Sequence, residues 1–336
     1  MKNITKIGLS ALAGALAMTS ANAGSLALSG SMEATYTTGS GYGTTGSNPF
    51  GMDKELSVTG SAELDNGTAV NYKQTITDAL AFNDSEIAFV IDGLGTIALT
   101  STGTPISAID NVTPTAFEEA EAGLTTGLDD VNGADGDYGI RWTLADVAGS
   151  GFTLDTFWTP EHGSGDATAD NAANGATYSN KDDAFEIVLK GSTPVEGLDV
   201  GIGYARLNST DTDTTGVAQA DYDQDEGTAY ATYAIGPAKL GFQRSVVSIG
   251  STNVLHETDY FGISYAVSDN LSVSYSRVDA DQTTAGTTVK QNMDGISMSY
   301  SMGGLTLNIA NNDCNDCSYT SGRNQDWQSM SLAIAF

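Results

Sequence analysis

The sequence predicts an all-β protein, a 16-stranded antiparallel transmembrane β-barrel whose long third loop folds into the lumen. Short segments of alternating apolar and polar residues recur along residues 24–336. Period-two alternation sends successive side chains to opposite faces of a sheet. The connections alternate between tight turns and long polar loops, which is typical of outer-membrane barrels. Within each segment, every second residue is apolar, and the residues between them are mostly Ser, Thr, Gly, Asn and acids. A lipid-facing apolar band around a wet interior explains both sets of positions.

Residues 1–23 have the pattern of a secretory signal peptide. Lys2 and Lys6 precede a short apolar run over residues 7–18, and Ala21-Asn22-Ala23 has the small-x-small form of a cleavage site. The run is too short to be a transmembrane helix. We therefore expect the barrel to occupy residues 24–336 and to be exported.

The composition excludes one large class of function. Removal of the leader would leave 11 basic residues against 42 acidic ones, whereas a nucleic-acid surface needs a basic footprint. Abundant Gly and Tyr with only 6 Pro favour strands rather than helices.

The strands follow from the alternation, element by element. In the first segment, Leu26, Leu28 and Tyr36 share one parity and Ser29 and Glu33 the other. Asn66-Gly67 then marks a hairpin, because this pair accepts the positive φ of a tight turn. The alternating segments cover residues 25–36, 55–64, 70–76, 86–91, 96–100, 138–144, 152–158, 185–189, 198–204, 229–235, 240–246, 261–267, 271–275, 296–302, 305–309 and 330–336. The alternative is a secreted β-solenoid or adhesin, which would lack the rhythm of short and long connections.

Two segments and the C-terminus carry a resemblance to a known family. The segments Ser85–Ile97 and Gly295–Leu305, together with the terminal Phe336, resemble strands of the general bacterial outer-membrane porins, most closely the alphaproteobacterial type. The resemblance implies a homotrimer in the outer membrane with a water-filled diffusion pore. It also implies that Phe336 is read by the barrel-assembly machinery.

The segment 103–136 is the expected pore constriction. It holds seven acids and no Lys or Arg, and a loop of this length inside a compact chain is usually functional. The chain departs from the porin pattern in this loop, where only Pro114, Phe117 and Glu118 echo the Pro-Glu-Phe-Gly-Gly stretch of the enteric porins.

The same loop and the facing wall predict the selectivity of the pore. Rings of charged side chains determine which ions a pore passes. On the wall, the inward-facing strand positions hold only Lys73 and Arg141 as basic residues, with Lys54 near a strand top. The sequence therefore predicts a cation-preferring diffusion channel for small hydrophilic solutes. The alternatives are a substrate-specific channel or a structural surface protein. The predicted constriction residues are Asp110, Glu118, Glu119, Glu121, Lys73 and Arg141.

Enzymatic chemistry is not expected. The two histidines, His162 and His256, fall in predicted loops, and no zinc spacing or nucleophile elbow is present. No cofactor is required. Calcium is the one candidate ion, because oxygen-rich clusters suit hard cations; the alternative is a solvated acidic rim. The candidate calcium ligands are Asp130, Asn132, Asp135 and Asp137.

Two further sets of residues carry predictions. Arg206, Arg244 and Arg277 each follow an outward aromatic by two residues, so we expect them on the outer face, where guanidinium groups suit lipopolysaccharide phosphates. Cys314 and Cys317 lie in the last long loop, and export to an oxidising compartment favours a disulfide between them. We expect this disulfide to be a loop staple with little effect on the barrel.

Overall fold

The computed structural model describes residues 25–44, 48–77, 82–162, 181–209, 223–250 and 253–335. The expected signal peptide and Phe336 lie outside these ranges. Sixteen strands are present within them: β1 (Ser25–Gly41), β2 (Phe50–Glu63), β3 (Ala69–Ile76), β4 (Phe82–Ile91), β5 (Gly95–Thr100), β6 (Gly139–Leu144), β7 (Phe152–Thr159), β8 (Lys181–Ser192), β9 (Leu198–Ser209), β10 (Gln224–Ile235), β11 (Ala238–Ile249), β12 (Val254–Ser268), β13 (Leu271–Thr284), β14 (Thr287–Met302), β15 (Leu305–Asn315) and β16 (Gln325–Ala335).

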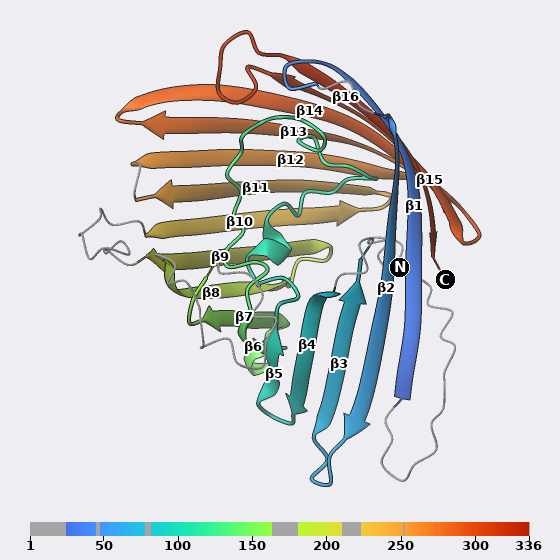
Figure 1. Ribbon diagram of the computed structural model, residues 1–336, viewed down its shortest axis with the longest axis vertical. Helices are drawn as coiled ribbons and strands as arrows, with labels where there is room; N and C mark the ends of the chain where they lie inside the picture. Colours follow the sequence, from blue (N-terminus) through green and yellow to red (C-terminus); the bar gives the residue numbers. More distant parts are fainter. Residues whose placement is uncertain are drawn as a thin grey trace.

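The strands form a closed antiparallel barrel (Figure 1). Each strand pairs with its neighbours in the chain, and β1 closes the sheet against β16 in a register that places Met32 opposite Ile334. Closure leaves no strand edge unpaired, which is the condition for a sheet to stand in hydrocarbon. The predicted 16-stranded antiparallel barrel is therefore confirmed.

The polarity of the barrel is the reverse of that of a soluble protein. On β11, Leu240 and Phe242 are 36% and 51% exposed, whereas the alternate residues Gln243 and Ser245 are 0% and 2% exposed. The same contrast recurs around the barrel, where many exposed side chains are large and apolar. An apolar exterior around a polar interior is the arrangement that lipid on the outside requires.

Three connections depart from the predicted alternation of short and long loops. Residues 77–81 between β3 and β4 and residues 250–253 between β11 and β12 are no more numerous than residues 193–197 of the turn between β8 and β9. The third connection is the shortest. Strands β13 and β14 are joined by Ala285 and Gly286 alone, both with positive φ (50° and 79°), as a tight two-residue hairpin requires. These two strands continue as a paired ribbon at the end of the barrel where a long loop was expected. Among the described residues, no helix is both long and apolar enough to cross a membrane.

Two apolar clusters involve the segment 101–138, which connects β5 to β6. The first joins Ile106, Ile109 and Val131 of this segment to Phe157 and Val188 of the wall. The second joins Ala120 to Tyr260, Val278, Met293 and the two cysteines. The apolar core of this protein is therefore the contact between one long loop and the barrel wall.

Candidate pore constriction

The segment 101–138, hereafter the constriction loop, lies along the inner faces of strands β8 to β16 (Figure 1). Its outgoing arm donates backbone N–H groups to wall side chains on three strands. Val112 bonds to Gln243 Oε1 at 2.9 Å, and Ala116 to Ser274 Oγ at 2.8 Å. Phe117 bonds to Ser297 Oγ at 3.0 Å. The accepting residues lie on the parity opposite to the exposed apolar side chains, so the loop covers the polar face of the sheet.

Glu186 of β8 holds both arms of the constriction loop. Its Oε2 accepts the N–H of Ile106 at 3.1 Å, and its Oε1 accepts the N–H of Ala134 at 2.8 Å. The side chain is fully buried. A carboxylate that accepts hydrogen bonds from two backbone groups ties together segments that are distant in sequence. Glu186 therefore fixes the point where the loop leaves and rejoins the wall.

Glu226 of β10 holds the return arm in a different way. A single oxygen, Oε2, accepts the N–H groups of Asn132 and Gly133, both at 2.8 Å. Gly133 has φ +60°, and a Cβ on it would lie 2.1 Å from Glu186 Oε1. The residue must be glycine for the return arm to reach both carboxylates.

The tip of the loop rests on the last strands. Asn312 Nδ2 of β15 donates to the carbonyl oxygens of Glu119 and Ala122 at 2.7 and 2.9 Å. The Thr125 N–H donates to Gln325 Oε1 of β16 at 2.7 Å. These bonds fix the backbone around Glu119, so the tip acids have defined positions.

The predicted constriction acids have different environments. Asp110 is exposed, and Glu118 and Glu119 are partly buried. Burial raises the pKa of Glu118, and the negative charge of Glu33 on β1 raises it further. Glu33 lies on the inward parity of β1, opposite to the exposed Leu28 and Tyr36.

Glu121 differs from the other acids, because burial raises its pKa to about 8. Its Oε1 accepts a hydrogen bond from Asn111 Nδ2 at 2.8 Å, while its Oε2 is buried without a hydrogen-bond partner. Burial also raises the pKa of Asp130, whose carboxylate accepts a hydrogen bond from the Tyr260 hydroxyl. Glu121 is therefore mostly protonated at neutral pH and adds little charge there.

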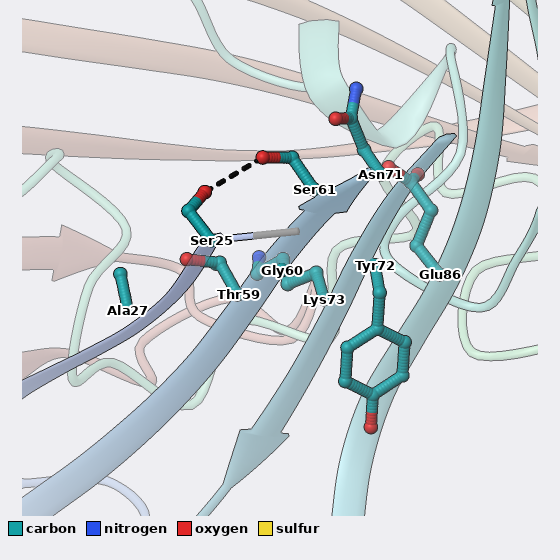
Figure 2. A pocket seen from close by; sticks show the side chains of 9 residues that line it. All are labelled: Ser25, Ala27, Thr59, Gly60, Ser61, Asn71, Tyr72, Lys73 and Glu86. Atoms are coloured by element: carbon teal, nitrogen blue, oxygen red, sulfur yellow. Dashed lines mark hydrogen bonds between the residues drawn. The ribbon is translucent and has the colours of Figure 1, made fainter. Parts of the chain in front are cut away.

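The wall on the other side of the barrel carries Lys73. It lies on β3 opposite Glu86 of β4 in the strand register. A hollow between β1 and β4 is lined by Lys73, Glu86, Asn71 and Thr59 among others. Figure 2 shows Tyr72 pointing away from Asn71 and Glu86, as strand alternation requires.

Arg141 and two further lysines complete the basic groups of the wall. Arg141 Nε donates to Asp155 Oδ1 at 2.9 Å, and its terminal nitrogen forms an ion pair with the same buried carboxylate. Lys190 on β8 and Lys239 on β11 also share the inward parity, as the buried neighbours Val188 and Gln243 show. The expectation of only two inward bases is therefore wrong. Lys190 and Lys239 are isolated basic residues beside tight turns, and nothing in the sequence except their place in the strand alternation marks them as pore-lining.

The structure does not bring the candidate calcium ligands together. Asp130 bonds to Tyr260, the Asn132 N–H bonds to Glu226, and Asp137 donates its N–H to the Ala134 carbonyl. Within the described ranges, no group of three or more acidic, histidine or cysteine side chains could hold a metal ion. Residues 133–136 form a turn that lies between Asn132 and Asp137.

The three arginines lie on the outer face, and each is paired with two carboxylates. Arg244 forms ion pairs with Glu257 at 3.0 Å and Asp259 at 3.6 Å. Arg277 pairs with Asp279 and Asp294, and Arg206 with Asp223 and Asp225. The guanidinium side chains remain 41–53% exposed. The outer rim thus carries three arginine-centred sets of ion pairs, which could not be predicted from the outward position of the arginines alone.

The remaining predicted residues are the two cysteines and the two histidines. Cys314 and Cys317 form a disulfide. His256 lies on β12, where its side chain is 2% exposed, so its expected loop position is wrong. The segment around it extends beyond the apolar band, and its outer face is acidic rather than apolar, which hides the strand alternation. His162 follows β7 outside the strands, as expected.

These features define a class of protein. A closed barrel with an apolar exterior, and an interior crossed by a loop, belongs to the pore proteins of the bacterial outer membrane. The family model for Gram-negative porins matches residues 8–335, and the chain belongs to that family. Family and fold point to a channel rather than an enzyme, and to the outer membrane as its location.

Solved structures with the same fold include proteins of known source. OmpT, an outer membrane protein of Vibrio cholerae, matches with a TM-score of 0.69 at 12% identity, over 96% of this chain and 100% of that chain. The trimer form of OmpT has a TM-score of 0.67 at 12% identity over 94% and 100%. The anion-selective porin from Comamonas acidovorans has a TM-score of 0.64 at 15% identity over 93% and 100%. None of the curated proteins compared with the chain matches it.

Proposed function

We propose that this protein forms a water-filled diffusion pore for small hydrophilic solutes and that the pore prefers cations. The observation that carries the preference is the presence of acids both on the constriction loop and on the inward parity of the wall. Glu118 comes from the constriction loop, and Glu33 comes from the facing wall on β1. A narrow opening lined by one sign of charge concentrates counter-ions.

The wall near Glu33 adds further acids. Glu33 pairs in register with Asp53 of β2, and Ser31 pairs with Glu55. All of these lie on the inward parity, opposite to Leu28 and Met52 on the exposed parity. At physiological salt the screening length is roughly 8 Å, so acids spaced across a narrow lumen still act together on a passing ion.

The basic groups balance this charge only in part. Arg141 is neutralised by the buried carboxylate of Asp155, and Lys73 stands opposite Glu86. Lys190 and Lys239 lie within two residues of the strand ends at the tight turns. They are therefore at the far end of the pore from the long loops, and the loop region stays negative.

The fold alone does not set the sign of selectivity. The relative from Comamonas acidovorans is anion-selective, and its barrel has the same architecture as this one. The sign must come from the side chains of each chain, which makes it testable by substitution.

The test is the reversal potential of single channels in a planar bilayer under a tenfold KCl gradient. We expect the sign of a cation-selective pore. Glu118→Gln with Glu119→Gln should move the potential toward zero, because two loop charges are removed. Glu196→Gln is the matched control, since Glu196 is an exposed acid in the turn between β8 and β9. An anion-selective sign, or equal shifts in both variants, would contradict the proposal.

We also propose that the pore is a homotrimer. The support is the trimer form of the similar Vibrio cholerae OmpT. Analytical ultracentrifugation of the protein in detergent should give a particle of three chains. A monodisperse single chain in mild detergent that still conducts would contradict it.

The three outer arginines are proposed to bind lipopolysaccharide phosphates. Each guanidinium keeps exposed surface beside its carboxylate partners, and phosphate suits the planar fork of N–H donors. Replacing Arg206, Arg244 and Arg277 with Gln should reduce the lipopolysaccharide that co-purifies. Unchanged lipid content would reject the idea.

A further inference from the structure

The turn after β15 has an unusual backbone. Asp316, Ser318 and Tyr319 have φ of 53°, 53° and 54°, although none of them is glycine. Left-handed conformations of this kind are strained for residues other than glycine and persist only where the surroundings enforce them. The Cys314–Cys317 disulfide closes this turn over a sequence separation of 3. The turn therefore holds a shape that its sequence does not favour.

The turn holds the return arm of the constriction loop at one point through Ser318. The Ser318 hydroxyl donates to the carbonyl oxygen of Thr125 at 2.9 Å, and its own N–H donates to Gln291 Oε1 of β14 at 3.0 Å. The turn thus bridges the wall and the loop. The cysteine side chains are 1% and 0% exposed and share an apolar cluster with Ala120 of the loop tip.

The turn holds the same arm at a second point through Tyr319. The Tyr319 ring lies edge-on to His256, with centroids 5.7 Å apart, and its hydroxyl lies 3.3 Å from His256 Nδ1. His256 Nε2 in turn lies 2.9 Å from Asp129 Oδ2 of the loop. Ser318 therefore contacts the loop directly at Thr125, and Tyr319 supports Asp129 through His256 of β12.

The geometry points to Cys314 and Cys317 as positioning residues for the pore constriction. Their disulfide keeps the turn in the shape that places Ser318 against the constriction loop and Tyr319 against His256, and the loop tip with Glu119 is held in place as a result. This inference rests on the proposed pore function and extends the expected loop staple to a role in the lumen. A cross-link that closes so short a ring removes little chain entropy, so the barrel itself should not depend on it.

The experiment compares four full-length mature proteins in planar bilayers. The variants are the double variant Cys314→Ala/Cys317→Ala, Ser318→Ala and the control Ser321→Ala, recorded beside the wild type. Ser321 is an exposed residue of the same loop. Resistance of the folded barrel to SDS before heating reports on folding in every sample.

We expect spontaneous closures of the open channel to rise roughly fivefold or more in the cysteine variant and in Ser318→Ala. For Ser318→Ala this is the change in population expected from losing one hydrogen bond worth about 1 kcal/mol, and the cysteine variant should lose the same bond when the turn changes shape. The reversal potential should move toward zero in the cysteine variant, because the tip acids lose their fixed positions. Ser321→Ala should match the wild type in both measurements.

The outcomes separate the inference from the pore function. Closure rates and reversal potentials equal to the control in both variants would overturn the inference. Conductance steps of the wild-type protein in the same experiment would still support the proposed pore function. A cysteine variant that no longer forms an SDS-resistant barrel would also overturn it, since the disulfide would then support the barrel as a whole. A wild-type protein that gives no conductance steps would instead refute the proposed function.

Discussion

The two loop-anchoring carboxylates should respond differently to the same substitution. At Glu186, each carboxylate oxygen accepts one backbone N–H, from Ile106 and from Ala134. At Glu226, one oxygen accepts both bonds, from Asn132 and Gly133. A glutamine has only one accepting oxygen. The change Glu186→Gln therefore turns an NH₂ group toward one backbone N–H, whereas Glu226→Gln can keep both bonds on its carbonyl oxygen.

The size of the difference in loop stability follows from the backbone N–H that loses its acceptor in Glu186→Gln. A buried N–H left without an acceptor costs about 1–3 kcal/mol, and both sites lose the extra strength of a charged acceptor. At Glu226 the new amide also meets Gln224, whose Nε2 donates to the other carboxylate oxygen at 2.7 Å. Rotation of the Gln224 amide restores that bond. We therefore expect Glu186→Gln to destabilise the docked loop by about 1–3 kcal/mol more than Glu226→Gln.

The assay is backbone hydrogen exchange, read at the peptides that contain Ile106 and Ala134. A difference of about 1–3 kcal/mol in local opening corresponds to roughly a fivefold to hundredfold faster exchange in Glu186→Gln than in Glu226→Gln. Strand peptides of β12 and β13 should be unchanged in both variants. Equal exchange in the two variants would refute the reasoning from oxygen geometry.

Three further results are expected. Cation preference should rise between about pH 7 and about pH 9, because Glu121 with its pKa near 8 ionises there, and reversal potentials across this range measure the change. The docked loop binds this proton more tightly than the undocked loop, so docking should weaken as pH rises from about 4.5 to about 8 and then level off, which loop exchange across that range measures. Glu121→Gln should abolish both changes. Gly123→Ala should destabilise the packing of the loop tip by roughly 1–3 kcal/mol, because its Cβ would lie 2.1 Å from the Trp327 ring. Gly322→Ala, with a similar φ and open space around it, isolates the cost of backbone strain. Unfolding monitored by tryptophan fluorescence distinguishes the two variants. A calcium chelator should leave conductance and selectivity unchanged, because the candidate ligands do not converge; a chelator-sensitive channel would contradict this.

The fold was predictable because the strand pattern is local. Leu240 and Phe242 alternate with Gln243 and Ser245 within a single strand, and period two alone assigns their faces. The same reasoning failed at the rim. His256 lies in a strand whose outer face is acidic, so the apolar half of the alternation is absent and the segment has the composition of a loop.

The candidate site was predictable only as a region. The acidic composition of residues 103–136 marks the loop, but its anchors, Glu186 and Glu226, are single acids within strands. Their role depends on which backbone groups of a distant segment reach them, and no local pattern encodes that. The state of Glu121 has the same origin, because its burial depends on how the loop packs against the wall.

The one-sided support of the constriction loop separates two properties of the pore. Outside the two ends of the loop, where Ser101 and Thr102 bond to β4 and Tyr138 bonds to β7, the hydrogen bonds that dock its arms and tip end on β8 to β16. The hollow on the facing wall is lined by residues of β1 to β4. Bulky or charged replacements at Thr59, Ser61 or Asn71 can therefore alter bore width without touching a bond that holds the loop. Substitutions on the wall of β1 to β4, whether engineered or arising in evolution, can therefore change permeability while the wall of β8 to β16 continues to hold the loop.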